Sequence, residues 1–228
     1  MASTTLTQYR LRVSAIIGLT GTAAGDEQTL IDGWVNEAQE QVLLKTHWGK
    51  VGTATMALTS GTDDYTLDAA ILSILDLYNT VSTTDYPLVR LTTQDLLTYR
   101  MNQATTPTTV QWYCQQANTL MLYPTPGSGE TLTIFYVPRP TAMTTGTHTP
   151  DSVPAEWHVA LEYYAFARAA EYNEQGPSQF GSYWRSLFER TCQEMKTAER
   201  RLGGTRPAAM RIGRRNRPML ADPSRIYR

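Results

Sequence analysis

The fold is decided by residues 151–173, which read DSVPAEWHVALEYYAFARAAEYN. Ser152 or Val153 gives a start signal for a helix, Pro154 suits its first turn, and Glu156 follows directly. The residues that then recur at helical spacing on one face are Trp157, Leu161, Tyr164, Ala165 and Arg168. These features predict a long helix that packs one face against a core.

A second long helix is predicted in residues 175–204, which read QGPSQFGSYWRSLFERTCQEMKTAERRLGG. Its expected stripe comprises Phe180, Trp184, Leu187, Phe188, Thr191, Met195, Ala198 and Leu202. Gly203 and Gly204 end it, because glycine tolerates the left-handed conformation found after many helices. The link over residues 173–177 is short, so the two helices are expected to form an antiparallel pair.

Two more helices are predicted near the start of the sequence, over residues 5–19 and 25–48. Asp26 is the expected N-cap of the second, and acidic residues in its first turn favour the helix dipole. The apolar positions expected on one face are Leu6, Tyr9, Val13, Ile16 and Ile17 in the first helix, and Leu30, Ile31, Trp34, Ala38, Val42 and Leu43 in the second.

The region between these helix pairs is rich in threonine and in turn residues, which predicts short strands. Residues 50–59 and 63–68 flank SGTDD, a predicted hairpin turn. Residues 71–81, ILSILDLYNTV, fit a strand or a buried helix, and their β-branched content favours a strand. Residues 91–100 predict a short helix capped by Thr92 or Thr93.

Three further strands are predicted over residues 109–116, 117–124 and 129–138. Their links are short and contain turn residues, so we expect a meander of three sequential strands. Cys114 shares a face with Val110 and Trp112 and is expected in the core.

Together these segments predict an α+β fold that is mainly a bundle of about four helices with an inserted antiparallel β region. Residues 1–49 supply the N-terminal helices of the bundle, and residues 50–140 form the β-rich insertion with its short helix. Residues 141–202 complete the bundle with the C-terminal helical pair. Residues 203–228 form an extended basic arm.

The charge distribution separates this arm from the rest of the chain. The arm holds seven arginines against Asp222, a net charge of +6, which leaves 13 basic and 20 acidic residues elsewhere, a net charge of −7. A general DNA-binding protein would be expected to have a basic folded surface, so the acidic body does not suit that class.

No motif for catalysis or cofactor binding is present in the sequence. His47, His148 and His158 have no metal-ligand spacing, and the patterns GxGxxG, GxxxxGK[ST] and GxSxG do not occur. Asp63 and Asp64 are interpreted as turn residues rather than as an acid pair or a Ca²⁺ site. We therefore expect no catalytic residues, no metal and no cofactor.

The remaining composition indicates where the protein is made. Cys114 and Cys192 form no metal-type cluster and are interpreted as reduced, buried thiols of a cytoplasmic product. No apolar stretch approaches the roughly 20 residues that span a bilayer, so no membrane association is expected.

The order of these features resembles the head-to-tail adaptor, or connector, proteins of tailed bacteriophages. The pattern is carried by LMLYPTP (120–126), by YVP (136–138) and by PAEWH (154–158), and the resemblance covers about residues 26–202. It leaves the role of the first helix open. It implies a virion protein of the neck that is assembled in the host cytoplasm. It also implies about twelve copies in a ring below the portal, a tail or nozzle protein beneath, and a C-terminal arm docked on the portal. It also implies that genomic DNA passes through the lumen without specific binding.

Two groups of residues are candidates for these contacts on chemical grounds. In the arm, apolar side chains suit pockets and arginines suit carboxylates, and the portal-docking candidates are Arg206, Met210, Arg211, Ile212, Arg214, Arg215, Arg217, Met219, Leu220, Arg225, Ile226 and Tyr227. The aromatic candidates for packing between subunits are Trp157, Tyr164, Trp184 and Phe188.

Two other functions remain open at the level of the sequence. The alternative is a nucleic-acid-binding protein that uses the basic arm, whose affinity would fall with salt at a log–log slope of about −6 for seven phosphate contacts. The second of these functions is an enzyme acting on a polymer, which would need paired carboxylates or a histidine-centred site.

Overall fold

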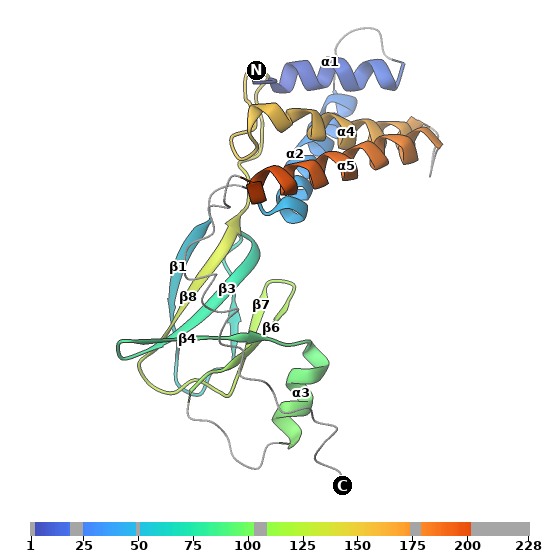
Figure 1. Cartoon of the computed structure of the whole chain (residues 1–228). Helices are drawn as coiled ribbons and strands as arrows, with labels where there is room; N and C mark the ends of the chain where they lie inside the picture. Colours follow the sequence, from blue (N-terminus) through green and yellow to red (C-terminus); the bar gives the residue numbers. More distant parts are fainter. Residues whose placement is uncertain (1–2, 19–24, 49–50, 103–108, 174–178, 202–228) are drawn as a thin grey trace. The chain divides into compact units, whose positions relative to one another are not determined.

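A computed structural model describes residues 3–18, 25–48, 51–102, 109–173 and 179–201. The chain divides into two compact units. The helical unit comprises residues 1–50, 69–73 and 137–203, and the β-rich unit comprises residues 51–68 and 74–136; residues 204–228 of the arm lie outside the described residues and are assigned to neither. The elements of both units are drawn in Figure 1.

The helical unit contains α1 (Leu6–Ile16), α2 (Asp26–Thr46), α4 (His158–Asn173) and α5 (Gln179–Arg201), and a 3-10 turn, Ala155–Trp157, leads into α4. Helices α4 and α5 are antiparallel neighbours, as predicted, and both also contact α2. At the start of α1, the Thr5 hydroxyl accepts from the Gln8 N–H and the Gln8 side chain accepts from the Thr5 N–H. This capping box satisfies two amides at the start of the helix.

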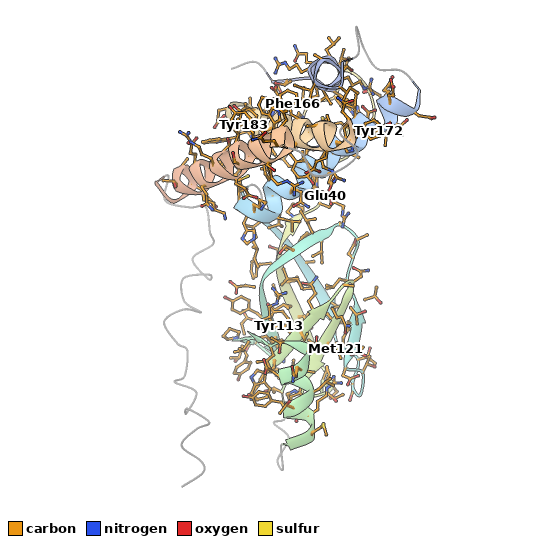
Figure 2. All side chains as sticks on the ribbon, turned by 90° about the vertical axis from the view of Figure 1, so that its right-hand side faces the viewer. Glu40, Tyr113, Met121, Phe166, Tyr172 and Tyr183 are labelled. Carbon is orange, nitrogen blue, oxygen red and sulfur yellow. The ribbon has the colours of Figure 1, made fainter. Side chains whose placement is uncertain are left out.

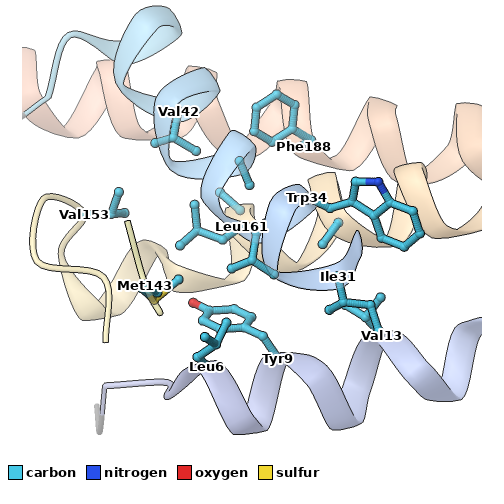
Figure 3. Close-up of a cluster of buried hydrophobic side chains, with 14 of the residues drawn as sticks. Leu6, Tyr9, Val13, Ile31, Trp34, Val42, Met143, Val153, Leu161 and Phe188 are labelled. Atoms are coloured by element: carbon cyan, nitrogen blue, oxygen red, sulfur yellow. The ribbon is translucent and has the colours of Figure 1, made fainter. Parts of the chain in front are cut away.

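The predicted stripes largely form the core of this unit (Figure 3). The buried side chains include Leu6, Tyr9, Val13, Ile31, Trp34, Ala38, Val42, Leu161, Ala165, Phe188 and Met195. Two expected core positions lie outside it, because Leu30 and Phe180 are exposed. Gly25, rather than Asp26, is the N-cap of α2.

The β-rich unit contains two four-stranded sheets. The first has the order β1-β8-β3-β4, with β1 (Gly52–Ala57), β8 (Glu130–Pro138), β3 (Ile71–Val81) and β4 (Thr84–Pro87). The second has the order β2-β7-β6-β5, with β2 (Asp64–Thr66), β7 (Thr119–Tyr123), β6 (Trp112–Gln116) and β5 (Val89–Arg90). Residues 71–81 thus form the predicted strand.

The short predicted helix is α3 (Thr93–Asn102), and its cap is Thr92, whose hydroxyl accepts from the Asp95 N–H at 3.2 Å. Leu96 on α3 packs with Cys114 and Tyr123 in a small core. The rings of Tyr99, Trp112 and Tyr123 stack in sequence, with centroids 5.3 and 5.9 Å apart.

The expectation of a mainly helical bundle is wrong, although the α+β class holds. The described part of the chain contains five α-helices, one of them in the β-rich unit, and eight strands in two sheets. The β-rich region buries apolar side chains of its own, among them Leu77, Leu96, Leu120, Leu122 and Leu132.

Two predicted strand pairings are also wrong. Strands β1 and β2 belong to different sheets, so no hairpin joins them, and β8 pairs with β1 rather than with β7. Only the β6–β7 hairpin of the expected meander forms. We expected strands that are neighbours in the sequence to pair. Instead, β1 pairs with β8, which lies far from it in the sequence, through six residue pairs from Gly52↔Tyr136 to Ala57↔Thr131.

Candidate assembly surfaces

The arm that carries the predicted docking residues lies outside the described residues. The positions concerned are Arg206, Met210, Arg211, Ile212, Arg214, Arg215, Arg217, Met219, Leu220, Arg225, Ile226 and Tyr227.

The four predicted subunit-packing residues all lie in the helical unit. Phe188 is 1% exposed and packs edge-on against Tyr164 at 5.2 Å. The Tyr164 hydroxyl donates to the Glu37 carboxylate at 2.6 Å. Trp157 is half-buried beside Trp48, with ring centroids 6.4 Å apart. Phe188 is thus occupied by the unit's own core, and the other three retain some surface.

Trp184 on α5 is the centre of a larger group of aromatic rings. Two of its neighbours lie on α4 at helical spacing, a signal that is present in the sequence. Its ring lies 5.8 Å from Tyr163, 5.1 Å from Phe166 and 5.2 Å from Tyr183. We call these four residues the aromatic patch; Figure 2 labels Phe166 and Tyr183. Tyr183 is 55% exposed and the others are half-buried. Of the four, only Trp184 was a predicted packing residue, although positions 163 and 166 share a helix face with exposed Val159.

Negative charge is concentrated in the β-rich unit. Its residues 51–68 and 74–136 contain Arg90 and Arg100 against seven acidic residues, a net charge of −5. The helical unit has 11 basic and 13 acidic residues, a net charge of −2. Arg100 is already paired with Asp63, with 2.7 Å between nitrogen and oxygen. Most of the acidic excess predicted for the body therefore belongs to one unit.

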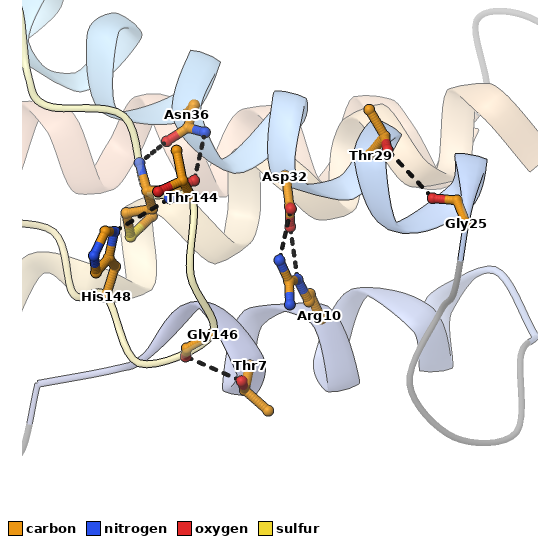
Figure 4. A network of polar contacts seen from close by, with 10 residues as sticks. Thr7, Arg10, Gly25, Thr29, Asp32, Asn36, Thr144, Gly146 and His148 are labelled. Carbon is orange, nitrogen blue, oxygen red and sulfur yellow. Dashed lines mark hydrogen bonds and ion pairs between the residues drawn. The ribbon is translucent and has the colours of Figure 1, made fainter.

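Helix α1 is held in the helical unit by polar contacts as well as by its apolar face (Figure 4). Arg10 donates through Nε and Nη2 to the two carboxylate oxygens of Asp32 on α2, both at 2.7 Å. The Thr7 hydroxyl donates to the Gly146 carbonyl at 3.0 Å. Asn36 on α2 accepts from the Met143 N–H at 2.8 Å and donates back to the Met143 carbonyl, which fixes the loop that α1 contacts.

His158 connects the segment before α1 to the start of α4. Its Nδ1 accepts from the Thr4 N–H at 3.1 Å, and its Nε2 donates to the Val153 carbonyl at 2.9 Å. The side chain is buried, and burial lowers the pKa of His158 while Glu156 opposes this effect. This geometry requires the neutral ring, because a protonated Nδ1 would face the Thr4 N–H as a second donor.

Because the folded state holds His158 neutral, the stability of the chain is expected to fall as the pH drops below about 6.5, the ordinary histidine value. Above that pH both states are neutral at this site, and below it the unfolded chain gains a proton that the folded chain resists. Urea midpoints between pH 7.5 and 5 measure the effect. His158→Gln keeps one acceptor and one donor without titrating, so an equally steep pH dependence in this variant would contradict the assignment.

The described residues contain no group of three or more histidine, cysteine, aspartate or glutamate side chains that could hold a metal ion. Within the same ranges, no helix is both long and apolar enough to cross a membrane.

No curated protein matches the chain. The family model described as SU10 adaptor protein matches residues 4–211, which include both units, the helix α1 that the resemblance left open, and the start of the arm. The chain therefore belongs to the SU10 adaptor protein family, a family of structural head-to-tail adaptors of bacteriophages.

Proposed function

We propose that about twelve copies of this chain form a ring below the portal in the phage neck, with the C-terminal arm of each copy docked on the portal. The observation that carries the proposal is the family match over residues 4–211, because head-to-tail adaptors have portal and tail proteins as partners. The ring would bind a tail or nozzle protein on its other side, and genomic DNA would pass through it.

The arm has the chemistry of a protein-docking segment. Its seven arginines alternate with apolar residues such as Met210, Ile212 and Leu220. Arginine binds carboxylates through paired hydrogen bonds, and the apolar side chains suit pockets between elements of a partner. An arm that bound only the DNA backbone would need the charge without the apolar anchors.

The aromatic patch is the surface that we assign to packing between neighbouring copies, together with Trp157 and Tyr164. Partly exposed aromatic rings on a helical pair are typical of oligomer interfaces, because they bury a large apolar area at a small entropic cost. Phe180 and Tyr172, 68% and 53% exposed, extend the apolar surface of the same two helices.

The charge of the folded body supports passage of DNA without binding. Negative surface charge repels phosphates, and the β-rich unit supplies most of it. We therefore propose that acidic residues of this unit contribute to the wall past which DNA moves.

Deletion of residues 203–228 is expected to abolish attachment to the portal and leave both units folded. Electron microscopy of the chain mixed with portal rings measures attachment, and circular dichroism measures folding. In the full-length chain, serine at Met210, Ile212, Met219 and Leu220 should weaken attachment without changing the charge. A matched variant with serine at Thr205 and Ala221 changes no apolar anchor and should attach normally. Portal attachment that survives the deletion would contradict the proposal.

The alternative of a basic arm that grips nucleic acid makes a separate prediction about the same segment. Affinity of the full chain for double-stranded DNA would fall with salt at a log–log slope of about −6. If the arm docks on protein, the chain should show no measurable DNA affinity at physiological salt. In an electron-microscopy map of the assembled neck, the arm should then lie against protein rather than against DNA.

A further inference from the structure

Among the strands that the structure describes, β1 is a sheet edge that lacks the usual protection against further pairing. It is the outer strand of its sheet, and residues 51–62, VGTATMALTSGT, contain no charged residue and no proline. Natural proteins usually blunt sheet edges with charges, prolines, bulges or very short strands, because an open edge is a template for another strand.

The direction of the β1 backbone groups follows from one hydrogen bond. The Leu58 N–H donates to the Glu130 carbonyl at 2.9 Å, in register with the ladder that pairs Gly52 with Tyr136. Hydrogen-bonded pairs alternate along antiparallel strands. Gly52, Ala54 and Met56 therefore direct their backbone groups toward β8, and the residues that direct theirs away from the sheet are Thr53, Thr55 and Ala57.

These three outward residues are exposed, and β1 is fixed well enough to act as a template. Thr53, Thr55 and Ala57 alternate with half-buried neighbours. The Tyr136 ring covers Gly52 so closely that a Cβ there would lie 2.5 Å from its Cζ. An aromatic ring over a cross-strand glycine helps to set strand register.

The other three edges of the described sheets are each protected. On β4, the same alternation places Asp85 and Pro87 outward, so that one position is charged and the other has no N–H. Strand β2 has three residues and begins at Asp64, and β5 has two residues and ends at Arg90. Because Pro87 blocks the β4 edge, continuation of the sheet from β1 into β4 of a second copy is disfavoured.

We propose that residues 208–217 of this chain's own arm, AAMRIGRRNR, add to the β1 edge as a strand before the chain meets a portal. This is the longest proline-free run after α5 and exceeds the six residues of β1. Met210 and Ile212 alternate with Arg211, which is the period of a strand with one apolar face. The run carries four arginines and no acid, and the β1 edge belongs to the unit with a net charge of −5. Main-chain pairing supplies affinity in this mode of recognition, and side-chain charge supplies selectivity.

The inference goes beyond the proposed function because it concerns the free chain. The arm covers an aggregation-prone edge until the portal captures it, and capture then exposes β1 in the neck. Docking of the arm on the portal and storage of the arm on β1 are separate events, and each can fail without the other.

Amide hydrogen exchange of the full-length free chain, followed residue by residue by NMR, tests the proposal. The outward amides of Thr53, Thr55 and Ala57 should exchange at least about tenfold more slowly than unpaired amides. Deletion of residues 203–228 should remove this protection. The inward amides of Gly52, Ala54 and Met56 are bonded to β8 and should stay protected in both chains, so they control for unfolding of the sheet.

Point variants in the full-length chain separate strand pairing from a general effect of the arm. Ile212→Pro removes a donor within the run and should abolish protection of the outward amides, whereas Ser224→Pro, outside the run, should leave it intact. Unprotected outward amides in the native chain would overturn the proposal. Protection that survives both the deletion and Ile212→Pro would overturn it as well, because another segment or a second copy would then cover the edge.

Discussion

Glu130→Ala is expected to lower the free energy of unfolding by about 3–5 kcal/mol, the larger of two effects that follow from buried charge. Glu130 is 3% exposed, at the start of β8. Its Oε1 accepts from the Gly127 N–H at 2.8 Å, and its Oε2 accepts from the Val110 N–H at 3.3 Å and from the Asn79 amide. Alanine would leave these three donors without an acceptor. It would also open a cavity among β3, β8 and the segment around Val110 that precedes β6.

A matched variant separates lost hydrogen bonds from lost charge. Glu130→Gln keeps the shape and one acceptor oxygen. Asn79 is fully buried, and its Oδ1 has no partner among the described residues. Rotation of the Asn79 amide could present this oxygen to the new glutamine N–H, so Glu130→Gln should cost clearly less than Glu130→Ala. Urea unfolding followed by the NMR signals of residues 109–123 measures the effect within the β-rich unit. Equal losses in the two variants would contradict the hydrogen-bond account.

Asp32→Ala is expected to lower the free energy of unfolding by about 2–4 kcal/mol, because it leaves the Arg10 guanidinium without its carboxylate. The two side chains are only 10% and 20% exposed, and two parallel hydrogen bonds join them. Their direct pairing raises the pKa of Arg10. The guanidinium stays charged even without this partner, because the ordinary arginine pKa lies far above neutral pH. The loss should appear first as detachment of α1 from α2, measured by amide exchange in residues 6–16.

Two controls define what this pair contributes. Glu189→Ala removes another ion pair with the same 2.7 Å separation, but Lys45 and Glu189 are 35% and 49% exposed, so the cost should stay below about 1 kcal/mol. Replacement of both partners, Arg10→Met with Asp32→Leu, should restore much of the stability that Asp32→Ala removes, because no buried charge is then left unpaired. If the double variant were as unstable as the single one, burial of an unpaired charge would not be the cause.

The helices could be predicted because their signals are local. The spacing of Leu6, Tyr9 and Val13 places them on one face in any environment, and the same holds for Leu161 and Ala165 on α4. A contiguous stretch of sequence therefore contains what is needed to predict both the helix and its buried side.

The pairing of strands could not be predicted, because it depends on contacts distant in sequence. Residues 129–138 have strand character wherever they lie, and nothing in them identifies β1 rather than β7 as the partner. Glu130 was missed for a related reason. An acidic residue beside the glycine-rich turn 127–129 resembles a surface residue, and only the convergence of Asn79, Val110 and Gly127 makes it a buried acceptor.

The two free cysteines have a practical consequence for an adaptor built from two units. Cys192 is 1% exposed in the core of the helical unit, and Cys114 is 3% exposed in the β-rich unit. Burial raises the pKa of the Cys192 thiol to about 11. A thiol-reactive reagent therefore reaches each sulfur mainly when its own unit opens. Each unit thus carries a native chemical reporter, and the rates of single-site labelling would show which unit loosens when the chain is bound by a portal or a tail protein.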